Sequence, residues 1–131
     1  MDVTVVYESL FGNTKRVAES IAAGARDAHP SVRVRLLSTS TGPPDGTAAP
    51  DLLIVGGPTH ALRMSTVASR RQGAQQDAQQ DAQQDERDES TGPDAPGARE
   101  WLGALAPAKD GSGAAAFDTR LSFLLAPFSA Q

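Results

Sequence analysis

Two short runs, VTVVY at residues 3–7 and LLIV at residues 52–55, consist almost wholly of β-branched, aromatic and leucine residues. Strands without a regular polar alternation are typical of a parallel sheet that is covered on both faces. After the first run, Val17 and Ile21 recur at helical spacing together with alanines at 18, 22 and 25. The chain therefore opens with a predicted unit of buried strand, loop and helix.

The remaining pattern extends this unit. Residues 32–36, VRVRL, alternate apolar and basic side chains, which favours a strand at the edge of a sheet. Helices are predicted near residues 64–71 and 97–105, and a fourth, weaker strand at 114–117. Strands that alternate with helices indicate an α/β domain with a mostly parallel sheet.

Length and composition favour one domain over residues 1–131. The absence of cysteine excludes disulfides, thiolate metal sites and cysteine nucleophiles. The sequence has no apolar run of about 18 residues and begins directly with strand-like sequence, without a signal peptide. We therefore expect a soluble, cytoplasmic protein that contacts neither membrane nor nucleic acid.

The middle of the chain, at about residues 73–97, is a low-complexity acidic insertion. AQQD occurs three times in tandem, at 74–77, 78–81 and 82–85. The aspartates recur at i, i+4, where like charges repel, and the repeat has no apolar stripe. We expect a solvated helix or disorder without a part in chemistry; an acidic arm that docks a partner is the alternative.

The loop after the first strand has the residue types of a phosphate site. Gly12 allows close approach of backbone amides, while Ser9, Asn13 and Thr14 supply donors at the start of a helix. Neither GxxxxGK[ST] nor GxGxxG is present, which disfavours nucleotide triphosphates and dinucleotides. The alternative is that Asn13 or Thr14 caps the helix and Gly12 makes a tight turn.

A second loop is predicted after residues 52–55, where two glycines precede Pro58, Thr59 and His60. Such a loop could contact the edge of a flat heteroaromatic ring. The only histidines are His29 and His60, and neither has an adjacent acid or nucleophile. The sequence therefore predicts no catalytic residue and no metal site.

SLFGNT after the first strand and GGPTH after the third resemble the flavodoxin family. The similarity continues through MSTVASRRQGA, REWL and AAFDTR, so it covers about residues 1–73 and 97–120. The resemblance implies a flavodoxin-like three-layer fold with a parallel sheet in the order 2-1-3-4, flavin mononucleotide (FMN) as the cofactor, and electron transfer.

Carried over to this sequence, the resemblance implies a cofactor-binding set of two groups. The phosphate would be bound by the side chains of Ser9, Asn13 and Thr14 and by the amides from Leu10 and Phe11 through Gly12 to Thr14. Pro58, Thr59 and His60 would line the isoalloxazine ring. The implied partner is a redox protein, either a reductase or an acceptor, or a small-molecule acceptor, and the protein would be an electron carrier or an FMN-dependent oxidoreductase.

The sequence departs from the family in two places. Phe11 stands where many flavodoxins have a more polar residue, and only 11 residues follow Arg120, too few for a fifth strand and a final helix. The fifth strand is therefore expected to be missing or rudimentary, which leaves an open sheet edge.

These departures keep two other interpretations open. One is a truncated flavodoxin-like module without flavin binding, acting as an interaction or vestigial domain. The other is a response-regulator-like domain, for which Glu8 alone and Gly56-Gly57 replace the expected acidic residues.

Overall fold

The computed structural model describes residues 1–9, 12–43, 49–60, 63–64, 66–78 and 94–119. Its centre is a parallel sheet of β1 (Asp2–Tyr7), β2 (Arg33–Ser38), β3 (Leu52–His60) and β5 (Gly113–Thr119). β1 pairs with β2 and β3, and β3 pairs with β5, so the parallel strands stand in the order β2-β1-β3-β5. The α/β fold and the flavodoxin-like order expected from the sequence are confirmed, with β5 as the fourth parallel strand.

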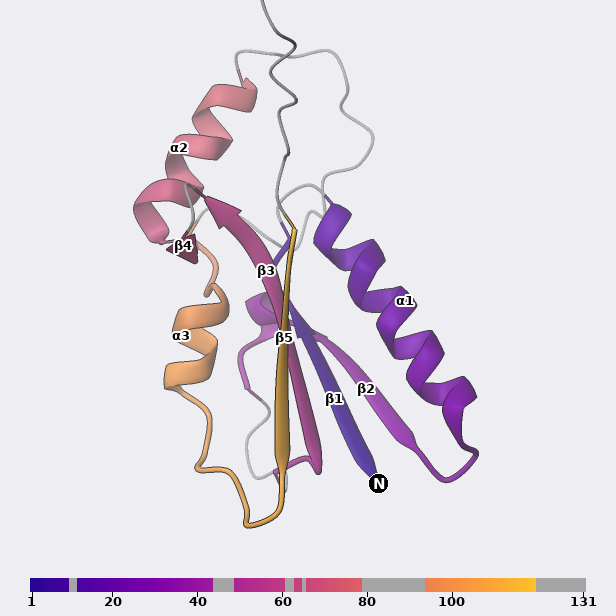
Figure 1. Ribbon diagram of the computed structural model, residues 1–131. Helices are drawn as coiled ribbons and strands as arrows, with labels where there is room; N and C mark the ends of the chain where they lie inside the picture. The colour runs from indigo at the N-terminus through magenta and orange to yellow at the C-terminus, as the bar shows by residue number, and fades with distance from the viewer. Residues whose placement is uncertain (10–11, 44–48, 61–62, 65, 79–93, 120–131) are drawn as a thin grey trace, which may run out of the picture.

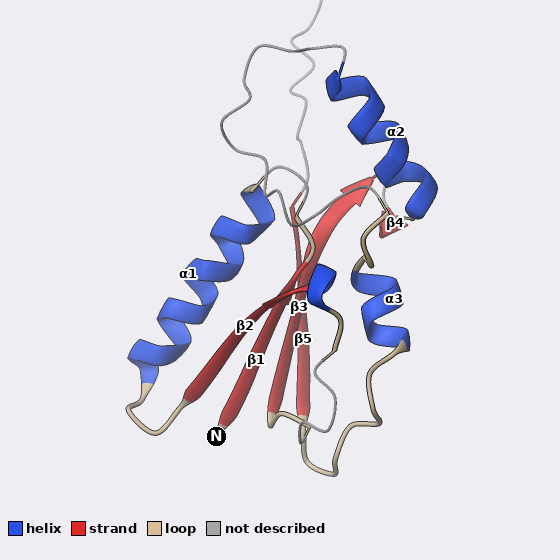
Figure 2. Cartoon of the chain, turned by 180° about the vertical axis from the view of Figure 1, so that it is seen from behind, coloured by secondary structure: helices blue, strands red, loops and turns tan. Residues whose placement is uncertain are grey.

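Helices cover both faces of the sheet. Figures 1 and 2 show α1 (Asn13–Ala28) on one side and α2 (Val67–Ala78) and α3 (Ala98–Gly103) on the other. Successive residues of β3 face opposite sides of the sheet. Gly56 faces the ring of Phe117 on the α1 side, whereas Gly57 faces Ala98 of α3. A short 3-10 helix, Thr39–Thr41, follows β2.

The core beneath α1 is formed by alternate residues of β1. Val3, Val5 and Tyr7 are buried against Ala18 and Ala22 of α1. The opposite face of β1 is buried too, since Thr4 and Val6 are 6% and 0% exposed. A strand covered on both faces is what the continuous β-branched and aromatic run at 3–7 predicts.

β2 lies at one edge of the described sheet. Its side chains alternate between exposed and half-buried up to Leu36, and Arg33 and Arg35 are among the exposed ones. The alternating pattern at 32–36 therefore placed this strand correctly. At the opposite edge, β5 pairs only with β3 within the described residues, and Ala114, Ala115 and Ala116 are exposed; the sequence expected for a rudimentary fifth strand lies outside those residues.

The prediction of a loop directly after residues 52–55 is wrong, because β3 continues through Gly56 to His60. Its end forms an antiparallel hairpin with β4 (Arg63–Met64) and pairs with β5 as far as Pro58 opposite Thr119. Pro58 is tolerated because the β1–β3 pairing ends at Tyr7 and Gly56, so the missing N–H interrupts no bond there. Residues 63–64 are also strand, and the helix expected from 64 begins at Val67.

α2 includes the first AQQD unit and ends at Ala78. Helix is thus confirmed for that unit, one of the two states expected of the insertion. The second and third units lie outside the described residues. The single-domain interpretation stays a prediction.

A substitution at Gly56 tests how tightly β3 packs against the ring of Phe117. A methyl group added there would meet the ring of Phe117, so Gly56→Ala should lower the free energy of unfolding by about 1–3 kcal/mol through overpacking. Gly24 of α1 has nothing within 4 Å of an added Cβ, and Gly24→Ala should stabilise by about 0.5–1 kcal/mol. Urea denaturation of both variants measures the difference; equal effects would contradict the packing described here.

Candidate functional site

The carboxyl ends of the parallel strands bring the sequence-predicted residues to one edge of the sheet. Ser9 lies two residues after the end of β1, Pro58, Thr59 and His60 end β3, and Thr119 ends β5. In open parallel sheets, ligands bind at this edge, where the strand order reverses. Here the reversal lies between β1 and β3, since β2 is on one side of β1 and β3 is on the other.

The first loop is closed by Ser9 rather than by a helix cap. Ser9 is 1% exposed, and its Oγ accepts a hydrogen bond from the backbone N–H of Gly12 at 2.9 Å. Gly12 has φ 81°, in the left-handed region, and no side-chain hydrogen bond caps α1. Capping by Asn13 or Thr14 is therefore wrong, whereas the tight turn at Gly12 is confirmed. Leu10 and Phe11 lie outside the described residues.

The start of α1 presents donors at this edge. The first backbone bond of the helix runs from Arg16 N–H to the Gly12 carbonyl at 3.0 Å, and amides before that point have no place in the helical ladder. Asn13 is exposed, and the first turn contains no acidic residue. These features favour an anion at the helix N-terminus.

Thr14 connects the first loop to the end of β5. Its hydroxyl lies 2.6 Å from that of Thr119, and Thr14 is 3% exposed. One of the two hydroxyls donates to the other, so the accepting hydroxyl keeps its own O–H to donate elsewhere. The sequence did not indicate this pair, because a contact between positions so far apart has no local signal.

The second group of predicted residues, Pro58 to His60, belongs to strand β3. Thr59 and His60 pair with Met64 and Arg63 in the β3–β4 hairpin. Pro58 lies on the wall of a cavity of about 350 Å³, formed by the ends of β3 and β5 and by Ala98 and Leu102 of α3. Of the predicted residues that the structure describes in full (Ser9, Gly12, Asn13, Thr14 and Pro58), only Pro58 lines this cavity.

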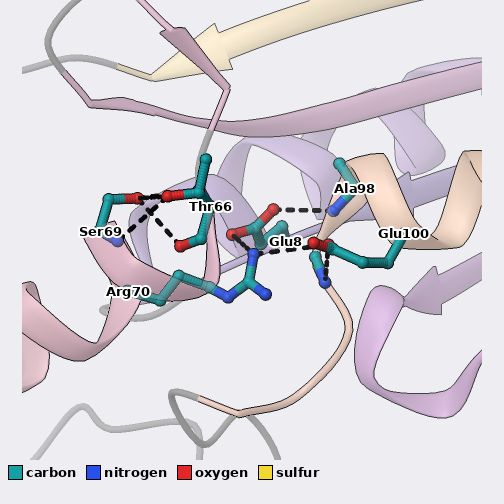
Figure 3. A network of polar contacts seen from close by, with 7 residues as sticks. Glu8, Thr66, Ser69, Arg70, Ala98 and Glu100 are labelled. Carbon is teal, nitrogen blue, oxygen red and sulfur yellow. Dashed lines mark hydrogen bonds and ion pairs between the residues drawn. The ribbon is translucent and has the colours of Figure 1, made fainter.

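The same cavity is bordered by Glu8, which belongs to a buried charge cluster that the sequence did not indicate. Figure 3 shows the side chains of Glu8, Arg70 and Glu100 pointing toward one another from the end of β1, from α2 and from α3. Arg70 Nη1 lies 3.7 Å from Glu8 Oε1 and 3.5 Å from Glu100 Oε2. The side chains of Arg70 and Glu8 are 1% and 3% exposed.

Backbone groups complete the cluster. Glu8 Oε2 accepts from the N–H of Ala98 at 2.8 Å, and Glu100 Oε2 accepts from the N–H of Gly97 at 2.9 Å. The start of α2 is closed by reciprocal bonds between Thr66 and Ser69, which precede Arg70 (Figure 3). The termini of two helices thus fix the charged groups around Glu8.

Gly97 lies at the centre of these groups. A Cβ at this position would meet Nη1 of Arg70 and come within 2.8 Å of Glu8 Oε2. Glycine is therefore the residue that lets Arg70 approach the carboxylates.

The pKa of the Glu100 carboxyl lies below its usual 4.5. Burial acts in the opposite direction and raises this pKa, but the backbone amides of Glu100 and Gly97 and the Arg70 guanidinium together stabilise the charged form. Glu100 is therefore ionised at neutral pH.

No protein-family model matches the chain, and no curated protein matches its sequence. Among the described residues, no group of three or more His, Cys, Asp or Glu side chains could hold a metal ion. No helix in the described part of the chain has the length and apolar character needed to cross a membrane. The flavodoxin family assignment stays a prediction.

The lowered pKa of Glu100 predicts a pH-dependent effect. Its contribution to stability is present above about pH 4.5 and is lost as the pH falls through the folded pKa. Glu100→Gln should lower the free energy of unfolding by about 0.5–1 kcal/mol at pH 7 and by less at pH 3. Urea denaturation at both pH values measures this.

Glu19→Gln, on the exposed surface of α1, is the matched control. The effect of Glu19→Gln on the free energy of unfolding should not become smaller between pH 7 and pH 3. A loss of stability at Glu100 that is as large at pH 3 as at pH 7 would contradict the assigned interactions.

Proposed function

We propose that this chain binds FMN and serves as an electron-transfer or oxidoreductase domain, with the phosphate held at residues 9–14. The observation that carries the proposal is the start of α1 at the carboxyl end of β1. There Gly12 turns the chain in the left-handed conformation, and the hydroxyls of Ser9 and Thr14 are buried beside it.

The donors at this position fit a phosphate monoester. Ser9 Oγ accepts from Gly12 and keeps its own O–H to donate, and the hydroxyl pair of Thr14 and Thr119 keeps another. Together with the helix N-terminus they supply neutral donors and a partial positive charge. A rigid set of such groups binds an anion without the desolvation that a charged side chain would require.

The ring of the cofactor would lie toward the end of β3, where Pro58, Thr59 and His60 follow two glycines. The cavity beside Pro58 has the size range of small-molecule sites. When bound, FMN supplies one- and two-electron redox chemistry, and the chain binds it, orients it and excludes water.

The partner in this proposal is a redox protein or a small-molecule acceptor, in the cytoplasm, with no role for nucleic acid or membrane.

One observation favours the second candidate function, a flavodoxin-like module that does not bind flavin. The hydroxyls of Ser9 and Thr14 already have partners inside the protein, as a loop that only starts a helix would require.

Gly12→Val tests the proposal. A β-branched residue is strained at φ 81°, and its side chain would occupy the space where amides approach the phosphate. We expect FMN affinity, measured by quenching of flavin fluorescence, to fall at least about tenfold, or 1.4 kcal/mol, with the far-UV circular dichroism unchanged.

Gly111→Val is the matched control. Gly111 has φ 78° and no atom within 4 Å of an added Cβ. It precedes β5, at the amino ends of the parallel strands and therefore away from the proposed site. It imposes the same backbone strain away from the site. Equal FMN affinity of both variants would remove residues 9–14 from the proposed site.

A further inference from the structure

Glu8 is the residue that comes immediately before the loop proposed for the phosphate in the chain, and its carboxylate lies on the side of α2 and α3. It precedes Ser9, and its backbone N–H is fixed to the Gly56 carbonyl at 2.9 Å. Its side chain is 3% exposed, so water screens its charge poorly. An uncompensated negative charge there would repel a phosphate dianion.

Arg70 supplies the compensating charge. Its guanidinium is 1% exposed and lies 3.7 Å from Glu8 Oε1, while the N–H of Ala98 holds the other carboxylate oxygen at 2.8 Å. The second carboxylate near Arg70, on Glu100, is 40% exposed and bonded to Gly97 N–H, so water screens it. Arg70 thus faces two carboxylates, of which the buried one, on Glu8, is screened less by water.

We propose that Arg70 is a positioning residue for the first loop: by neutralising and fixing Glu8, it allows this edge of the sheet to select a phosphate-bearing ligand over its neutral counterpart. The inference rests on the proposed function. Arg70 does not itself contact the ligand, and it acts from α2, a segment that neither predicted loop includes.

Charge neutralisation and mere packing make different predictions. If Arg70 only packs α2 against the sheet, its loss weakens every ligand alike. If it neutralises Glu8, its loss weakens an anionic ligand selectively, and removal of the Glu8 charge restores binding. FMN and riboflavin provide this comparison because they differ only in the phosphate.

The experiment measures the dissociation constants of FMN and riboflavin for the full chain by quenching of flavin fluorescence. In Arg70→Met, the preference for FMN over riboflavin should fall about tenfold, or 1.4 kcal/mol. Arg70→Lys, which keeps the charge, and the double variant Glu8→Gln/Arg70→Met should each restore the preference to within about threefold of the wild type.

Arg71→Met is the matched control. It removes the same charge from the next residue, whose side chain is 60% exposed and paired with Asp94 at 2.6 Å. Its preference for FMN should stay within about twofold of the wild type. An equal loss in Arg71→Met would assign the effect to net charge and overturn the inference.

If Arg70→Met does not fold, Glu8→Gln alone decides. Its amide oxygen can still accept from Ala98, and its preference for FMN should rise about threefold because Arg70 then faces the Glu100 carboxylate without that of Glu8. An unchanged or lowered preference would overturn the inference. Equal losses for FMN and riboflavin in a folded Arg70→Met would overturn it and leave the proposed function standing, whereas a wild type without a preference for FMN would overturn both.

Discussion

The burial of β1 between two parallel strands determines the rest of the structure. β1 pairs with β2 on one side and β3 on the other, and both of its faces are covered. Val5 and Val6 are fully buried, and each such side chain contributes about 1.5–3 kcal/mol of hydrophobic stabilisation. Because β1 is fixed, the chain that leaves it at Glu8 and Ser9 emerges at a defined place on the sheet edge.

The two residues that follow β1, Glu8 and Ser9, make contacts on opposite sides of the sheet. Ser9 closes the turn that begins α1, and Thr14 joins that helix to the end of β5. Glu8 instead contacts α2 and α3 through Arg70 and Ala98. Two adjacent residues thus connect the strand to both helical layers, and the proposed role of Arg70 depends on this connection.

Sequence patterns identified the elements whose burial is periodic. The apolar run at 3–7 predicts a strand covered on both faces, and the basic alternation at 32–36 predicts an edge. The pattern failed at 56–60, because glycine and proline indicate a loop, whereas pairing with β5 and β4 makes these residues strand. Tertiary pairing overrode the local preference there.

The candidate site was predictable only in part. A tight turn at Gly12 was one interpretation of its residue type, and the position of Ser9 after the strand follows from the pattern at 3–7. The ion pair of Glu8 and Arg70 could not be found in this way, since its members share no spacing or motif and meet only when α2 and α3 pack on the sheet. The same holds for the bond between Thr14 and Thr119.

The most direct test of the account is a titration of the purified wild-type protein with FMN and with riboflavin, followed by the quenching of flavin fluorescence. We expect FMN to bind at least about a hundredfold more tightly than riboflavin, or 2.7 kcal/mol, because only FMN carries the phosphate. A folded protein that binds neither flavin, or both equally, would contradict it and favour the module without a cofactor.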